Sequence, residues 1–206
     1  MTILYKSTIY SEKLKGIFMV NMYIGLIHHP VLGRKEEIIT TSVTNLDIHD
    51  IARSSRTFGF KKYFIVTPVI KQQALVQTIL DHWNKDADNS YNPDRSSALA
   101  FIEIANTIED AISQIKELEG VDPIVVATGA NFDEFTGTEK ELRDKLQVDK
   151  RPIFLIFGTG WGLHASVVNN ADYKLDPIVG TAEDGYNHLS VRSAVAIYCD
   201  RLSRSL

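Results

Sequence analysis

Strand-like and helix-like segments alternate along most of this chain, and the alternation is the feature that most restricts its fold. Short apolar runs are separated by segments of about 10 to 15 residues whose apolar residues recur at helical spacing. This pattern predicts an α/β fold with a mainly parallel sheet and helices on both faces. The expected strands are residues 22–29, 62–68, 100–106, 122–131, 151–158 and 172–180, and the expected helices are residues 48–58, 69–83, 107–120, 136–147 and 190–202.

The composition is that of one soluble globular domain. Hydrophobic residues make up 44% of the 206 residues, and no apolar stretch reaches the roughly 20 residues of a membrane helix. We therefore expect a folded domain over residues 22–206, preceded by an extension or linker over residues 1–21, and no membrane partner. Residues 1–21 lack the apolar segment of a secretory signal, and Cys199 is the single cysteine, so a cytoplasmic location is expected.

Charge and histidine placement limit the ligands to be considered. A formal net charge of -4 argues against binding nucleic acid through overall electrostatics but leaves room for a local arginine patch. Arg53 and Arg56 are three residues apart on one expected helix, a spacing that favours convergence on a backbone phosphate. His28 and His29 are adjacent on a strand and point to opposite faces, so no metal site is predicted.

The expected strand at residues 151–158 ends in three glycines at alternate positions, Gly158, Gly160 and Gly162, with Trp161 among them. Their spacing fits a dinucleotide-binding fingerprint poorly, and the Lys-Ser/Thr pair of a phosphate-binding P-loop does not follow them. Glycines that only make turns are the structural alternative. The glycines therefore indicate a place where bare main chain approaches a ligand closely.

Two further glycine-containing segments lie at the carboxyl ends of other expected strands. They are "ATGAN" at residues 127–131 and "DPIVG" at residues 176–180. In parallel α/β sheets, ligands bind beyond the carboxyl ends of the strands. Three such segments on one edge of the sheet predict a single ligand site rather than three unrelated turns.

Four segments, taken in order, resemble the SPOUT class of RNA methyltransferases. The late ones are "FGTGWGL" (157–163), "ADYKLDPIVG" (171–180) and "YNHLSVRSAVAIYCDRL" (186–202). The early one, "TNLDIHDIARSSRTFGF" (44–60), resembles the first motif of the ribose-methylating branch, in which an arginine, here Arg53, lies six residues before a glycine. Residues 22–204 most closely resemble a compact bacterial subfamily that is sometimes fused to a tRNA guanine methyltransferase.

This resemblance implies a fold, a cofactor and an assembly. The C-terminal segment is expected to thread through a loop as a trefoil knot. The knotted loops are expected to hold S-adenosylmethionine in a bent form, and two copies of the chain to form a homodimer in which both complete each active site. The cofactor-binding residues that the resemblance implies are Thr128, Gly129, Phe157, Gly158, Gly160, Trp161, Ile178, Gly180, Asn187 and Leu189.

The resemblance also implies a reaction. The expected substrate is RNA, in particular a ribose 2'-hydroxyl of tRNA, with Arg53 facing the acceptor and Ser190 orienting the ribose or phosphate. Many ribose-methylating relatives have asparagine where this chain has His188, and a histidine side chain titrates near neutral pH, which makes it an alternative base. Methylation of an RNA base, with His188 or Asp50 handling the proton, is therefore a second hypothesis. A catalytically silent cofactor-binding or dimerisation module that acts through a fused or partner enzyme is a third.

Overall fold

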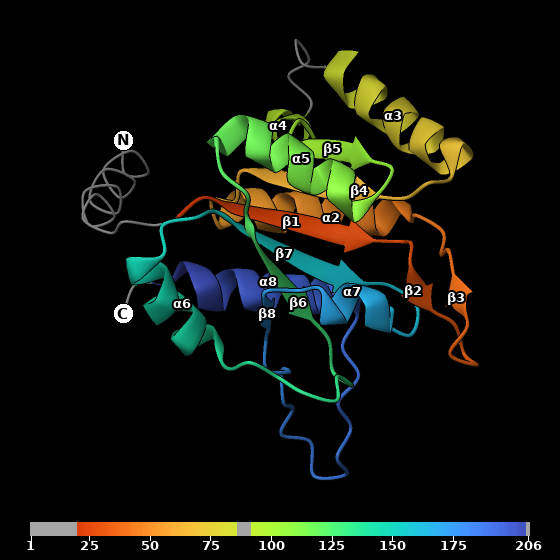
Figure 1. The fold of residues 1–206 in the computed structure, drawn as a ribbon. Helices are drawn as coiled ribbons and strands as arrows, with labels where there is room; N and C mark the ends of the chain where they lie inside the picture. Colours follow the sequence, from red (N-terminus) through yellow and green to blue (C-terminus); the bar gives the residue numbers. More distant parts are fainter. Residues whose placement is uncertain (1–19, 86–91, 205–206) are drawn as a thin grey trace.

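The computed structural model describes residues 20–85 and 92–204. Its centre is a six-stranded sheet with the order β5-β4-β1-β7-β6-β8, and every hydrogen-bonded pair of neighbours is parallel (Figure 1). The expected N-terminal extension lies, up to residue 19, outside the described residues. The six strands are β1 (Met22–Ile27), β4 (Lys62–Val66), β5 (Ile102–Ala105), β6 (Ile124–Thr128), β7 (Ile153–Gly158) and β8 (Tyr173–Lys174).

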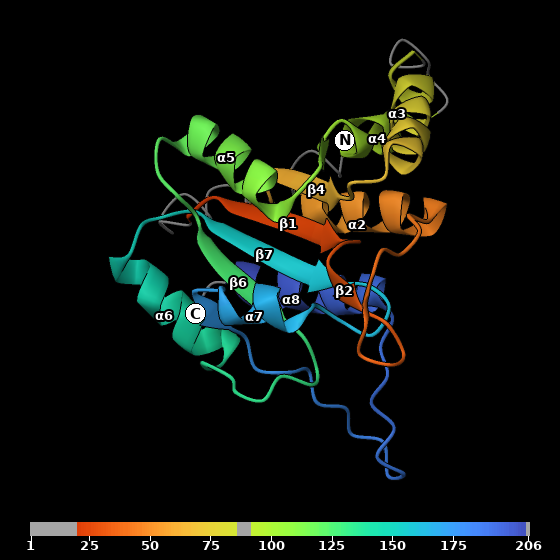
Figure 2. The ribbon, with the colours of Figure 1, turned by 45° about the vertical axis from the view of Figure 1, so that its right-hand side comes forward.

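Helices cover both faces of this sheet, as expected (Figures 1 and 2). Successive residues of β1 enter different core clusters: Ile24 and Leu26 face one, and Tyr23 and Ile27 face the other. Helices α2, α3, α4, α6 and α8 contribute to the first cluster, and α5 and α7 to the second. The helices are α2 (Asn45–Thr57), α3 (Ile70–Lys85), α4 (Pro93–Leu99), α5 (Ile108–Glu119), α6 (Glu139–Val148), α7 (Ala165–Asn169) and α8 (Val191–Ser203).

Local capping explains where several helices begin and end. Thr107 caps α5 by accepting a hydrogen bond from the Asp110 backbone N–H, and Gly120 ends that helix in the left-handed region at φ +73°. Thr138 caps α6 in a capping box with Glu141. None of the helices in the described part of the chain is both long and apolar enough to cross a membrane.

Several elements differ from the sequence-based expectation. A short antiparallel pair, β2 (Val31–Leu32) with β3 (Ile38–Ile39), was not predicted, because two-residue strands are too short to show an alternating pattern. Helix α4 lies between the expected helix at residues 69–83 and the expected strand at residues 100–106, where no helix was predicted, although an asparagine cap followed by proline is a recognisable helix start. Strand β8 is only two residues long: the Leu175 backbone N–H still donates to the Ala127 carbonyl of β6, but that of Asp176 donates to the carbonyl of Gly137 instead.

Candidate functional site

The loop that leaves β7, residues 158–163 and here called the glycine loop, turns back sharply on itself. A Cβ at Gly158 would lie 2.5 Å from the backbone nitrogen of Leu163, so only glycine fits there. Gly160 and Gly162 have φ values of +61° and +108°, which L side chains rarely adopt. Glycine is therefore required at all three positions by the backbone of the turn itself.

Residues around β2 hold the glycine loop in place. The Leu32 backbone N–H donates to the Gly162 carbonyl at 2.9 Å, and the Trp161 N–H donates to the Leu32 carbonyl at 3.2 Å. One residue beyond the loop, the His164 N–H donates to the Pro30 carbonyl at 3.3 Å. Trp161 has a fixed backbone but is 64% exposed to solvent, so a large apolar side chain is available for contact beside a rigid loop.

A chain of side-chain hydrogen bonds fixes the start of the same loop. Thr159 Oγ1 donates to the Ile27 carbonyl at 2.9 Å and lies 2.5 Å from Thr41 Oγ1, which in turn lies 3.0 Å from His28 Nδ1. His28 is fully buried, and this burial lowers its pKa to about 4, with Asp47 acting in the opposite direction. The ring is thus neutral at physiological pH and has a structural role.

The segment from residue 176 to 190, here called the late loop, is drawn toward β7 by one tyrosine. Tyr198 on α8 donates its hydroxyl to the Asp176 carbonyl at 2.8 Å, and its ring centroid lies 6.0 Å from that of Phe157 on β7. Burial raises the pKa of Tyr198, so the hydroxyl remains a donor. Ile178 packs against the same core cluster. The end of β7 and the start of the late loop therefore lie at one edge of the sheet, as expected.

Farther along, the late loop is stabilised by its own side chains and is exposed to solvent. Asn187 accepts a hydrogen bond from the Gly180 N–H at 3.0 Å and donates to the Ile178 carbonyl at 2.9 Å. A Cβ at Gly180 would lie only 3.0 Å from Asn187 Oδ1. All residues from 179 to 190 are exposed, Leu189 among them. The asparagine thus shapes a loop that has no cover from the rest of the described chain.

The two predicted residues after β6 are used differently. Thr128 is buried, and its hydroxyl donates to the Ile156 carbonyl at 3.0 Å, so its proton joins β6 to β7. A Cβ at Gly129 would lie 2.4 Å from the Phe132 ring. Thr128 and Gly129 are therefore used in hydrogen bonding and packing at the edge of the sheet, and we call these two residues the wall of the site. The Thr128 hydroxyl proton is not free for a ligand.

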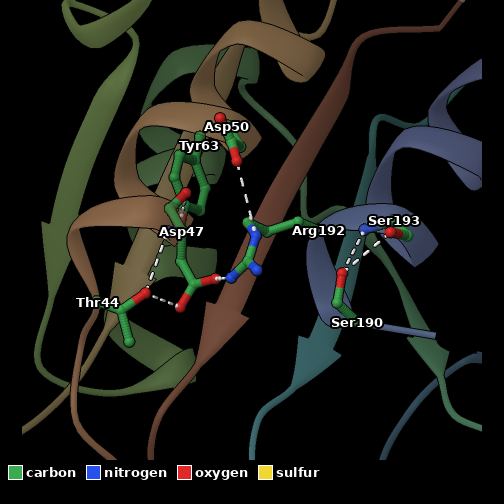
Figure 3. Close-up of polar contacts among 7 residues, drawn as sticks. All are labelled: Thr44, Asp47, Asp50, Tyr63, Ser190, Arg192 and Ser193. Carbon is green, nitrogen blue, oxygen red and sulfur yellow. Dashed lines mark hydrogen bonds and ion pairs between the residues drawn. The ribbon is translucent and has the colours of Figure 1, made fainter. Parts of the chain in front are cut away.

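An ion-pair network joins the start of α2 to the start of α8 (Figure 3). Arg192 Nη1 lies 2.7 Å from Asp47 Oδ1, and Arg192 Nε lies 3.6 Å from Asp50 Oδ2. Thr44, the cap of α2, donates its hydroxyl to the other oxygen of Asp47 at 2.5 Å. Asp47 is buried, so the guanidinium and the hydroxyl compensate for its desolvation.

Sequence reasoning overlooked Arg192. The signal available was an arginine two residues after Ser190 in the last motif, but no spacing rule identifies its partner 145 residues earlier. Only the packing of α2 against α8 brings the two together.

The predicted catalytic residues are spread over two regions. Ser190 caps α8, its Oγ accepting from the Ser193 N–H at 3.2 Å (Figure 3). His188 is exposed, with its ring edge-on to Tyr186. Arg53 instead lines a pocket between α2 and α4, whose lining includes neither Ser190 nor His188. Within one chain, Ser190 and His188 thus belong to the late loop, and Arg53 belongs to a pocket that no late-loop residue lines.

The glycine loop fits the demands of a nucleoside cofactor. Such a ligand needs main chain with little side-chain cover and an apolar surface for its base. A Cβ at Gly162 would meet no atom within 4 Å, so space opens beside this backbone, and the exposed Trp161 stands next to it. Phe157 adds buried apolar surface at the end of β7. These residues suit a flat heterocycle better than a metal ion.

Comparison with known proteins identifies relatives over the whole described domain. A family described as SAM-dependent RNA methyltransferase matches residues 21–204. A tRNA (guanine-N(1)-)-methyltransferase of Oleidesulfovibrio alaskensis is 42% identical over 182 residues, which are 88% of this chain and 42% of that protein. An uncharacterized protein of Aquifex aeolicus is 37% identical, with 88% of each chain covered. The chain thus spans less than half of the first relative.

A solved structure gives the same fold at much lower identity. The SpoU methyltransferase AviRb from Streptomyces viridochromogenes superposes with a TM-score of 0.55 at 12% identity, covering 89% of this chain and 58% of that one. At this identity the likeness shows the fold alone.

We expect replacement of Arg192 by methionine to lower the free energy of unfolding by about 1–3 kcal/mol, because Asp47 is then left buried without its cation. Urea denaturation measures the change. Arg204→Met is the matched control, since Arg204 pairs with Asp200 at the surface and its side chain is 68% exposed, so its loss is expected to cost less than about 0.5 kcal/mol. Equal effects of the two substitutions would contradict the role given to the network.

The buried His28 predicts a pH dependence of stability. Its ordinary pKa is 6.5, and in the folded protein the pKa is about 4. Below pH 6.5 the unfolded chain takes up a proton that the folded protein does not, so the free energy of unfolding decreases as the pH is lowered. His28 is expected to account for a decrease of about 2 kcal/mol between pH 7.5 and pH 5. Urea titrations of His28→Gln are expected to lose this contribution, whereas His29→Gln retains it; a His28→Gln slope identical to wild type would contradict the assignment.

Proposed function

The chain belongs to the SAM-dependent RNA methyltransferase family, and from this membership we propose that it transfers a methyl group from S-adenosylmethionine to a ribose 2'-hydroxyl of tRNA. The observation that carries the methyl-transfer part is the junction of the glycine loop with the late loop at one edge of the sheet, through Phe157, Tyr198 and Asp176. The ribose part rests on the early motif, with Arg53 six residues before Gly59.

The residues proposed to hold the cofactor divide by the surface that each supplies. When bound, S-adenosylmethionine supplies an electrophilic methyl group on a sulfonium. The glycine loop offers close-approaching backbone at Gly158, Gly160 and Gly162, and Trp161 offers an apolar surface. The remaining contacts come from the wall, the end of β7 and the late loop: Thr128, Gly129, Phe157, Ile178, Gly180, Asn187 and Leu189.

On the acceptor side, Arg53 is proposed to stabilise the negative charge that develops as the ribose hydroxyl loses its proton. A guanidinium remains protonated, so it acts as an electrostatic stabiliser rather than as a base. Ser190 is proposed to orient the ribose or a phosphate through its exposed hydroxyl, and His188 to accept the proton, since its ring is open to solvent. Methyl transfer then depends on positioning of donor and acceptor more than on a metal.

A homodimer is proposed because, within one chain, no residue of the late loop lines the pocket that holds Arg53. Arg53 lines the α2–α4 pocket, whereas Ser190 and His188 lie on the late loop. The exposed late loop carries apolar side chains, with Val179 exposed by 74% and Tyr186 by 65%. A second copy that covers this loop would bury that surface and bring its own Arg53 to the cofactor. The trefoil knot remains a prediction that accompanies this arrangement.

The name of the Oleidesulfovibrio relative favours a second candidate, methylation of guanine at N1. That protein is more than twice as long as the matched segment, so its named activity need not reside in this portion, and we propose that a segment like this chain acts beside a second tRNA methyltransferase there. In a base-methylating enzyme, Asp50 or His188 would handle the proton. Asp50 pairs with Arg192 at 3.6 Å, which leaves it a weaker candidate than the exposed His188.

The reaction is tested by incubating the protein with unfractionated tRNA and methyl-labelled S-adenosylmethionine, followed by alkaline hydrolysis. A methylated 2'-hydroxyl blocks cleavage of one linkage and leaves the label in a dinucleotide, whereas base methylation leaves it in a mononucleotide. Cofactor binding without transfer would indicate the silent module instead.

We expect Arg53→Ala to reduce methyl transfer by about 100-fold or more while the dissociation constant for S-adenosylmethionine stays within a few-fold of wild type. The reason is that the guanidinium acts on the acceptor rather than on the cofactor. Lys140→Ala, an equal loss of charge on the exposed face of α6, is the control and is expected to remain active. Loss of cofactor binding in Arg53→Ala would contradict the assignment to the acceptor side.

We expect Gly160→Val to weaken cofactor binding by at least about tenfold in calorimetry, because the side chain would press on Thr41 and on the Leu32 carbonyl, 3.2 and 3.3 Å from its Cβ, and displace the loop. Gly120→Val is the control: it imposes a similar positive φ, +73°, after α5 and meets no atom within 4 Å. An unchanged dissociation constant for Gly160→Val would remove the glycine loop from the site.

A further inference from the structure

We propose that the pocket between α2 and α4 is a binding site for backbone phosphates of the RNA substrate. The pocket has a volume of about 570 Å³ and carries three arginines, Arg53 and Arg56 from α2 and Arg95 from α4. Thr57, Asn92 and Asp94 complete its polar lining. The identity of the ligand as RNA rests on the proposed function, whereas the preference for phosphate rests on the side chains themselves.

Two of the arginines are held by contacts that leave N–H groups free. Arg56 donates from Nη1 to the Asp94 carbonyl at 3.4 Å and to the Ser97 hydroxyl, and its guanidinium lies 5.9 Å from the centroid of Phe101. Arg95 lies 5.3 Å from the centroid of the Trp83 ring. A guanidinium has five N–H donors, and contact with an aromatic face uses none of them. Both groups are thus oriented without being saturated.

The pocket also has an excess of positive charge. Arg53 makes no hydrogen bond or ion pair within residues 20–85 and 92–204, and Asp94 is the one carboxylate among the lining residues against three guanidinium groups. His49 lies on α2, as Arg53 does. Burial lowers the pKa of His49 most, and the charges of Arg95 and Arg53 lower it further, while Asp50 acts in the opposite direction. Positive potential therefore gathers here on a chain whose formal net charge is -4.

This arrangement suits phosphodiesters. Arginine forks match the geometry of phosphate oxygens and bind them through paired hydrogen bonds. An RNA strand that crosses the pocket would place one phosphate at Arg56 and Arg95. Arg53 would then lie at the end of the pocket that faces the acceptor nucleotide. The pocket would thus set the register of the RNA, because phosphate contacts position a nucleic acid without reading its sequence.

The test is fluorescence anisotropy with a labelled single-stranded oligouridylate of twelve nucleotides, at several salt concentrations and without S-adenosylmethionine. We expect Arg95→Gln to weaken binding by roughly fivefold to tenfold at low salt and to reduce the slope of log Kd against log salt by about 0.7, the value for one lost phosphate contact on a single strand. Lys140→Gln on α6 removes the same charge and is expected to keep the wild-type slope. Arg95→Lys is expected to restore the slope, which a change in packing alone would not do.

Competition separates the possible sources of the anion. Inorganic phosphate at millimolar concentration is expected to displace the oligouridylate from wild type and to have little effect on the residual binding of Arg95→Gln. Three results would overturn the proposal: slopes for Arg95→Gln and Lys140→Gln that agree, competition by phosphate that is equal in both proteins, or displacement by an acidic peptide such as oligoglutamate that matches displacement by RNA.

The outcome is distinguishable from failure of the proposed function. If wild type methylates tRNA but Arg95→Gln keeps the full salt slope, the phosphate site is wrong and the methyltransferase assignment stands. If wild type neither binds S-adenosylmethionine nor methylates tRNA, while the slope falls in Arg95→Gln and returns in Arg95→Lys, the phosphate site stands on its own.

Discussion

Strands β1 and β7 pair in parallel at the centre of the sheet, from Met22 opposite Ile153 to Ile27 opposite Gly158, across 131 positions of sequence. Five of the six residues of β7 and all six of β1 are buried, so this pairing is stabilised by apolar surface on both faces. Because the two strands run in the same direction, they end side by side. His28 and the glycine loop therefore meet at one edge, and the Thr41–Thr159 contact joins them there.

The C-terminal part of the chain, which consists of the late loop and helix α8, packs at the same edge of the sheet. Two contacts attach helix α8 near this edge: the ion pair of Arg192 with Asp47 at its start, and the contacts of Tyr198 with Phe157 and Asp176 farther along. Both attachments depend on groups that burial makes costly to leave unpaired. The late loop that precedes α8 is thereby fixed at its two ends while residues 179–190 between them stay exposed. A loop with anchored ends and an uncovered apolar middle is suited to receive a ligand and a second chain.

The glycine loop shows how far local sequence reasoning reaches. Its position after a buried strand and its alternating glycines were sufficient to predict an unusual turn, and Gly158, Gly160 and Gly162 each prove to need glycine. The hairpin beside this turn was missed, because β2 and β3 are two residues long and the hydrogen bonds of β2 to the glycine loop involve backbone atoms alone. Backbone contacts between distant segments leave no residue signature. The assignment of these residues to a cofactor remains a prediction from the family resemblance.

The sequence by itself determined the α/β class, most strands and helices and several caps, because these depend on apolar periodicity and on side chains within one turn of the backbone. It also carried the motifs that identify the family. The tertiary structure alone decided which charges of different elements meet: Arg192 pairs with Asp47 across 145 positions, and Arg95 of α4 joins Arg53 and Arg56, whose spacing on α2 the sequence already showed, in one pocket. Charged side chains have no periodic pattern that names a partner, and their interactions exist only once packing of the apolar faces has brought α2, α4 and α8 together.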